Sequence, residues 1–172
     1  MVYNIELKNV KIYESLSQET NCFTASLYIN KKLVAYCQNH GEGGCTFINA
    51  KDKESDNLIL TVDQWCKKNS IKRNGYQINS LEQRVDDIID QKVEEKENKK
   101  IEKKCISNLC FTTSKDGELV LSYNQFGWKN VKNLSDMLNN TKGKEIIIKT
   151  IKTELSKGYR LINKNIPQEL YK

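Results

Sequence analysis

The segment NHGEGGCT, residues 39–46, brings together the residue types that most readily bind a phosphate group in a loop. Glycine permits positive φ and lets an anion approach the backbone closely, so successive N–H groups can form a concave anion site. The competing interpretation is an ordinary hairpin turn, because the segment lacks the Walker A and dinucleotide-binding patterns and Glu42 would repel a phosphate. The predicted ligand-binding residues of this loop are His40, Gly41, Gly43, Gly44 and Thr46.

Catalysis is not expected from this chain. His40 is its only histidine, and no G-x-S-x-G, H-E-x-x-H or H-x-E motif with paired cysteines supplies a catalytic partner. The carboxylates Asp86, Asp87 and Asp90 could hold a divalent cation, but we interpret them as a solvated helix face. The six cysteines show no C-x-x-C spacing and are interpreted as reduced, semi-buried thiols. We therefore predict no enzymatic activity, no metal and no cofactor.

A second candidate site is the aromatic and basic segment YNQFGWKN. Its rings could stack on a base above a surface lined by lysines. The same residues could instead form a sheet edge that closes over the core, or an exposed interface for a protein partner. The predicted ligand-binding residues of this segment are Tyr123, Phe126, Trp128 and Lys129.

The charge of the chain is concentrated at one end. Residues 1–102 contain 15 Lys and Arg against 16 Asp and Glu, whereas residues 103–172 contain 13 against 6. A net charge of +7 in the second segment would attract a polyanion such as nucleic acid. A solvated lysine-rich face is the alternative, since the chain has only three arginines and arginine is the preferred residue for bidentate recognition of phosphates and bases.

The 172 residues are enough for one domain that needs no disulfides, and 38% apolar residues indicate a small core. The N-terminus lacks a basic segment followed by an apolar run, and no apolar stretch approaches the roughly 20 residues that cross a bilayer. We expect a cytoplasmic protein without membrane contact.

Alternating apolar residues predict an antiparallel β-meander over residues 1–50. The first strand, residues 3–12, changes parity near Lys8-Asn9, which indicates a bulge. Strands over 20–29 and 33–38 flank a tight turn at Asn30, and a further strand is expected at 45–49.

Residues 51–104 are predicted to be helical. A first helix over 55–68 has Ser55 or Asp56 as its possible cap, and an Asn-Gly turn follows in a connection. The motif SLEQ, residues 80–83, is a capping box for a second helix whose apolar face runs from Leu81 to Val93 before a charged extension.

Residues 105–172 are predicted to be a basic α/β part. Asp116-Gly117 separates two apolar runs and is typical of a hairpin turn, and a short helix over 131–140 follows. Residues 144–158 have the apolar spacing of a helix that ends at Gly158, although their Ile and Thr content leaves a strand open, and residues 159–163 suit a last strand. Together these elements predict a single α+β unit with an N-terminal antiparallel β-meander, a central capped helix and a basic C-terminal α/β part.

The order N-x-F-x-A-x-L-Y-I-N, then N-x-G-x-G-G-x-T, resembles a group of small uncharacterised proteins of bacteria and their phages. His40 departs from that pattern, which has an acidic residue there. The resemblance implies a phage or mobile-element protein active in the host cytoplasm. We therefore expect a non-catalytic protein that binds and inhibits a host factor, as an anti-defence protein that sequesters a nucleotide-like signal or a defence protein. The alternative is a basic nucleic-acid-binding accessory protein, and a homo-oligomer is compatible with either.

Overall fold

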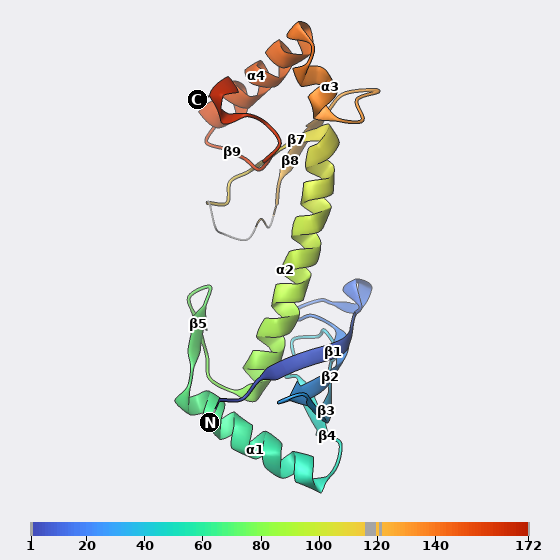
Figure 1. The fold of residues 1–172 in the computed structure, drawn as a ribbon, viewed down its shortest axis with the longest axis vertical. Helices are drawn as coiled ribbons and strands as arrows, with labels where there is room; N and C mark the ends of the chain where they lie inside the picture. The colour runs from blue at the N-terminus through green and yellow to red at the C-terminus, as the bar shows by residue number, and fades with distance from the viewer. Residues whose placement is uncertain (1, 116–119, 121, 172) are drawn as a thin grey trace. The chain divides into compact units, whose positions relative to one another are not determined.

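The structure of the protein is a computed structural model that describes residues 2–115, 120 and 122–171. It divides into two compact units, Met1–Val93 and Glu94–Lys172, which we call the N-terminal unit and the C-terminal unit. The elements follow the predicted order, with four strands, helices and then further strands, so the architecture is α+β as predicted (Figure 1). Each unit is described by itself.

The N-terminal unit contains a four-stranded antiparallel sheet in the order β1-β2-β3-β4, as expected for a meander. Its strands are β1 (Ile5–Ile12), β2 (Phe23–Ile29), β3 (Lys32–Asn39) and β4 (Phe47–Ala50). Asn30 and Lys31 have φ of 50° and 69°, as a two-residue turn with the twist of a hairpin requires. The predicted bulge is confirmed by a register shift between Lys8 and Lys11.

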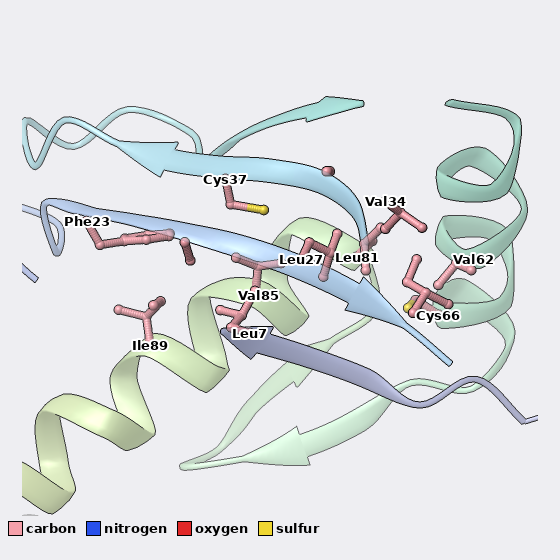
Figure 2. Packing of buried hydrophobic residues seen from close by; sticks show 13 residues of the cluster. Leu7, Phe23, Leu27, Val34, Cys37, Val62, Cys66, Leu81, Val85 and Ile89 are labelled. Atoms are coloured by element: carbon pink, nitrogen blue, oxygen red, sulfur yellow. The ribbon is translucent and has the colours of Figure 1, made fainter. Parts of the chain in front are cut away.

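The core of this unit lies between the sheet and two helices, α1 (Lys53–Lys68) and the beginning of α2 (Leu81–Ser107). Figure 2 shows Phe23 of β2 near Ile89 of α2, and Val34 of β3 near Val62 of α1. Leu27 of β2 lies between them, near Leu81 and Val85 of α2. The apolar positions of α2 recur every four residues, as one face of a helix requires. The helix residues of this cluster that the figure labels are Val62, Cys66, Leu81, Val85 and Ile89.

The two helices begin at different kinds of cap. Asp52, rather than the predicted Ser55 or Asp56, caps α1, because its carboxylate accepts from the Ser55 N–H at 2.8 Å. The predicted cap of α2 is present, since Ser80 Oγ accepts from the Gln83 N–H at 3.1 Å. The Gln83 side chain also reaches back, and it accepts from the Asn79 N–H at 2.8 Å.

The connection between the helices is itself a small hairpin of β5 (Ile71–Arg73) and β6 (Tyr76–Ile78). Its turn is the predicted Asn-Gly pair, with φ of 49° at Asn74 and 83° at Gly75. Arg73 Nη1 donates to Asp87 Oδ1 of α2 at 2.7 Å, which ties the hairpin to the helix.

The C-terminal unit contains a three-stranded sheet in the order β8-β7-β9. Its strands are β7 (Asn108–Thr112), β8 (Asn124–Gly127) and β9 (Arg160–Leu161), and its helices besides the end of α2 are α3 (Leu134–Leu138) and α4 (Thr141–Ser156). The predicted Asp116-Gly117 turn lies outside the described residues. Leu109 and Phe111 of β7 pack against Ile147 and Ile151 of α4, which forms a second core.

The close approach of α3 and α4 depends on Gly143. A Cβ atom at this position would lie 2.5 Å from the Met137 carbonyl oxygen, so only glycine lets the two helices meet here. Asn140 caps α4 by accepting from the Gly143 N–H at 3.1 Å. The helix ends at Ser156, and Gly158, which was predicted to end it, follows two residues later with φ of 88°.

Two short 3-10 turns, Glu14–Leu16 and Gln168–Leu170, complete the regular structure of the described chain. None of its helices combines the length and the apolar character needed to cross a bilayer.

Candidate functional site

The glycine loop is organised around the buried side chain of Asn39, which is 5% exposed at the end of β3. Its Oδ1 accepts from Thr20 Oγ1 at 2.9 Å and from the Gly41 N–H at 2.8 Å. Its Nδ2 donates to the Gly44 carbonyl at 3.0 Å and to Thr46 Oγ1 at 3.1 Å. One amide thus uses both of its donors and both of its acceptor positions, and it joins the loop to Thr20.

Backbone groups of the loop make hydrogen bonds within the protein, which leaves fewer of them to contact a ligand. Gly41 has φ of 87°, and its carbonyl accepts from the N–H groups of Gln18, Glu19 and Thr20. The Gly41 and Gly43 N–H groups donate to side chains, at 2.8 Å to Asn39 and 3.3 Å to Thr20. Two of the donors that a phosphate site would need are therefore already used.

Thr46 connects the loop to the first turns of α2. Its N–H donates to Glu82 Oε1 at 2.9 Å, and its hydroxyl donates to Asp86 Oδ1 at 2.5 Å. The side chain predicted to bind a ligand is instead buried and positions a carboxylate. One turn further along α2, Asp90 Oδ1 accepts from Asn21 Nδ2 at 2.8 Å.

These contacts surround a cavity of 380 Å³ in the N-terminal unit. We call it the acidic cavity, because Glu19, Asp86 and Asp90 line it and no lysine or arginine that the structure describes does so. Phe23 and Ile89 contribute its apolar surface. The remaining lining residues are Ser17, Gln18, Thr20, Asn21, Asn39 and Gly44.

The carboxyl of Asp86 is strongly perturbed by its place in the cavity. Burial raises its pKa to about 6, the charges of Glu82 and Asp90 add to that increase, and the hydrogen bond from Thr46 opposes it. The same arrangement, chiefly through burial and secondarily through the Asp86 charge, raises the pKa of the Cys37 thiol to about 12. The cavity is thus a place where a negative charge is costly and a positive charge is stabilised.

His40 lies outside this cavity. Its side chain is exposed, and its ring contacts the Phe47 ring edge-on with centroids 6.0 Å apart. In the part of the chain that the structure describes, no group of three or more histidine, cysteine or acidic side chains could hold a metal ion.

The residues of the second predicted site belong to the C-terminal unit, so the structure does not show them joining the glycine loop. Phe126 lies on β8, an outer strand, and contacts Phe111 edge-on with centroids 5.6 Å apart. Trp128 packs against the core of that unit, and Tyr123 packs beside Ile101. Lys129 is exposed. The segment therefore forms part of a sheet edge that covers a core.

Asn39, Thr20 and Glu19 were not predicted from the sequence to belong to a site. One signal was present in β3, where Ala35, Cys37 and Asn39 share a buried face. An asparagine at the end of a buried face must find hydrogen-bond partners, so it marks a polar network. The positions of Thr20 and Glu19 depend on contacts between segments distant in the sequence.

Comparison with known proteins does not assign the chain to a family: no protein family, no curated protein and no solved structure matches it.

Proposed function

We propose that the protein is a non-catalytic binding protein. Its acidic cavity accepts a lysine or arginine side chain of a host protein. The observation that carries this proposal is the lining of the cavity. Glu19, Asp86 and Asp90 supply negative charge, and Phe23 and Ile89 supply an apolar surface for the alkyl stem of a basic side chain. A surface built in this way recognises shape and charge and requires no covalent chemistry.

The protein-binding version of the predicted function is better supported than the nucleotide version. A phosphate would enter a cavity of carboxylates, and the Gly41 and Gly43 N–H groups already donate to Asn39 and Thr20. The resemblance in sequence is what supports a phage or mobile-element setting. It also supports the proposal that binding inhibits the host factor.

The binding proposal is tested with blocked Gly-Arg-Gly and Gly-Lys-Gly peptides as probes and blocked Gly-Gln-Gly as the neutral control. Calorimetric titration at low salt should detect binding of the basic peptides alone, and affinity should rise as the pH passes through about 6, where Asp86 loses its proton. The double variant Glu19→Gln, Asp86→Asn should weaken binding about tenfold or more, which corresponds to about 1.4 kcal/mol.

The matched control is the double variant Glu54→Gln, Asp56→Asn, which removes two exposed carboxylates of α1 outside the cavity and should leave the affinity unchanged. Equal losses in the cavity variant and this control would reduce the effect to general charge attraction. A thermal shift with nucleotides but not with basic peptides would overturn the proposal in favour of the nucleotide version.

A second candidate function, binding of nucleic acid, is favoured by one face of α4. Lys142, Lys149 and Lys152 are exposed and, at 3.6 residues per turn, lie on the same side of the helix. The opposite side, with Ile147 and Ile151, is buried in the core. Among the described residues none of the three lysines has a carboxylate within 4.0 Å, so their charges are available to phosphates.

This candidate predicts binding of labelled single- or double-stranded DNA with an affinity that falls steeply with salt. Changing all three lysines to glutamine should reduce the slope of log K against log salt by about 2 to 3, because each neutralised phosphate contributes about 0.7 to 0.9. Lys53, Lys68 and Lys72, exposed in the N-terminal unit, provide a control triple variant with the same loss of charge. Equal effects of the two triple variants would remove the α4 face as the binding surface.

A further inference from the structure

Two cysteine side chains meet in the C-terminal unit, away from the acidic cavity. Cys105 lies near the end of α2 and is 7% exposed, and Cys110 lies in β7 and is fully buried. Their side chains pack in one buried cluster with Ile101. The interaction between the two thiols shifts the pKa of each, so the two sulfur atoms are neighbours within this cluster.

A single asparagine fixes the backbone of both cysteines. Asn163, which is also buried, donates from Nδ2 to the carbonyls of Cys105 and Asn108, each at 2.9 Å. Its Oδ1 accepts from the Cys110 N–H at 2.7 Å, and Asn165 Nδ2 donates to the same Cys105 carbonyl at 3.1 Å. The two thiols are held in position by this polar clamp, so little chain entropy remains to oppose a bond between them.

Only one of the two thiols faces an open cavity. Cys105 lines a cavity of 540 Å³ together with the apolar side chains of Ile106 and Ile162. Arg160 and Lys164 bring positive charge to this cavity, and Glu102, which also lines it and lies 3.4 Å from Lys164 Nζ, brings negative charge. Cys110 is fully buried and is not among the lining residues. An anionic reagent that enters the cavity thus meets Cys105 beside a net positive charge.

We propose that Cys105 and Cys110 form a redox modification site that a small anionic disulfide, with glutathione disulfide as the probe, oxidises to an intramolecular disulfide. The Cys105 sulfur attacks one sulfur of the reagent and releases the first glutathione. The Cys110 sulfur then attacks Cys105 in the mixed disulfide and releases the second glutathione. The two thiols lose two electrons, the reagent gains them, and the two thiol protons leave on the two glutathione thiols.

The attacking sulfur must first lose its proton, because the thiolate is the nucleophile. The interaction with Cys110, burial and the charge of Glu102 raise the pKa of Cys105. The interaction with Cys105 and the charge of Lys104 lower the pKa of Cys110, and burial opposes that decrease. Cys110 is the neighbouring group to which Cys105 can pass its proton as the first bond forms.

The test uses the full chain with the exposed Cys45 changed to serine, so that its thiol does not react with the probe. After treatment with glutathione disulfide, the intact mass should fall by two hydrogens, and peptide mapping should link Cys105 to Cys110. The additional change Cys110→Ser should stop the reaction at one glutathione adduct on Cys105. Cys105→Ser should give neither an adduct at Cys110 nor a disulfide.

Circular dichroism and the melting temperature of each variant show whether it is folded. The peptide mapping of the Cys45→Ser protein leaves Cys105 and Cys110 unchanged, so its result does not depend on whether the further variants fold. Absence of the Cys105–Cys110 bond in that protein, while Cys45 of the unsubstituted protein forms a glutathione adduct under the same conditions, would overturn the proposal. A stable adduct on Cys105 with Cys110 still present would overturn it as well. The outcome does not depend on the function of the acidic cavity.

Discussion

At the scale of residues, polar side chains of the N-terminal unit form hydrogen bonds that hold carboxylates in place. Asn39 is satisfied at all four positions of its amide, and Thr46 donates both its N–H and its hydroxyl to acids of α2. Such a network is costly to break, because each unpaired buried group retains its desolvation penalty. Its product is the half-buried carboxylate of Asp86, which faces the acidic cavity.

Asp86 is expected to lower the stability of the protein at neutral pH. A carboxyl whose pKa is raised to about 6 binds more protons in the folded than in the unfolded state, so the free energy of unfolding falls as the pH rises from about 4 to about 6. Asp86→Asn removes the charge and keeps an oxygen for the Thr46 hydroxyl. Allowing for solvent screening, we expect a gain of about 1 kcal/mol at pH 7 and almost none below pH 4, measured by urea unfolding.

The pH dependence separates this effect from a change in packing, which would alter stability equally at both pH values. A variant less stable than the parent at pH 7 would show that the charged form is stabilised by its surroundings. Together with the loss of peptide binding, a gain in stability would show that Asp86 is retained for binding at a cost to folding.

At the scale of elements, α2 begins at a defined cap while its middle section carries few apolar residues. Ser80→Ala removes the acceptor for the Gln83 N–H and should lower the free energy of unfolding of the N-terminal unit by about 1 kcal/mol. Thr61→Ala is the matched control, because it also removes a hydroxyl but in the exposed interior of α1, where alanine favours the helix. Denaturant unfolding followed by far-UV circular dichroism compares the two variants, and equal losses would contradict the capping role.

Strands β1 to β3 and the start of α2 could be predicted because their signals are local. Phe23, Ala25 and Leu27 alternate along β2, and Ser80 precedes Gln83 by one helical turn. The hairpin of β5 and β6 was predicted only as a connection with a turn, since three-residue strands with exposed side chains leave no apolar pattern. The cap of α1 was wrong because Asp52, Ser55 and Asp56 are chemically similar and backbone geometry decides among them.

The acidic cavity could be predicted only in part. Glycines with positive φ were expected in the loop, and Gly41 and Gly43 have it. The expectation of an anion site rested on free N–H groups, and whether they are free depends on Asn39 and Thr20. The approach of Glu19 and α2 to this loop is a tertiary contact that no local pattern encodes.

At the scale of the whole molecule, the two units have separate cores. The first core includes Leu27, and the second includes Ile151. Units with their own cores can open separately, so one free energy of unfolding does not describe both. The net charge of the molecule follows the same division, because the basic segment identified in the sequence lies entirely within the C-terminal unit.

Truncation within each core should therefore act locally. Leu27→Ala and Ile151→Ala each delete a fully buried aliphatic side chain and should cost about 2 to 5 kcal/mol in the unit that contains them. Native-state hydrogen exchange is expected to show faster exchange in the altered unit and unchanged protection in the sheet of the other. Equal acceleration in both sheets would mean that the units unfold together.

The packing of α3 against α4 also restricts which mutations the gene can accept at residue 143. Codon 143 must keep encoding glycine, since even the smallest added side chain would strike the Met137 carbonyl. The exposed neighbours Lys142 and Lys144 carry no such steric restriction, so the fold tolerates other residues at both positions. In a library that samples every amino acid at every position, the folded variants should all keep glycine at position 143 and should carry many different residues at positions 142 and 144.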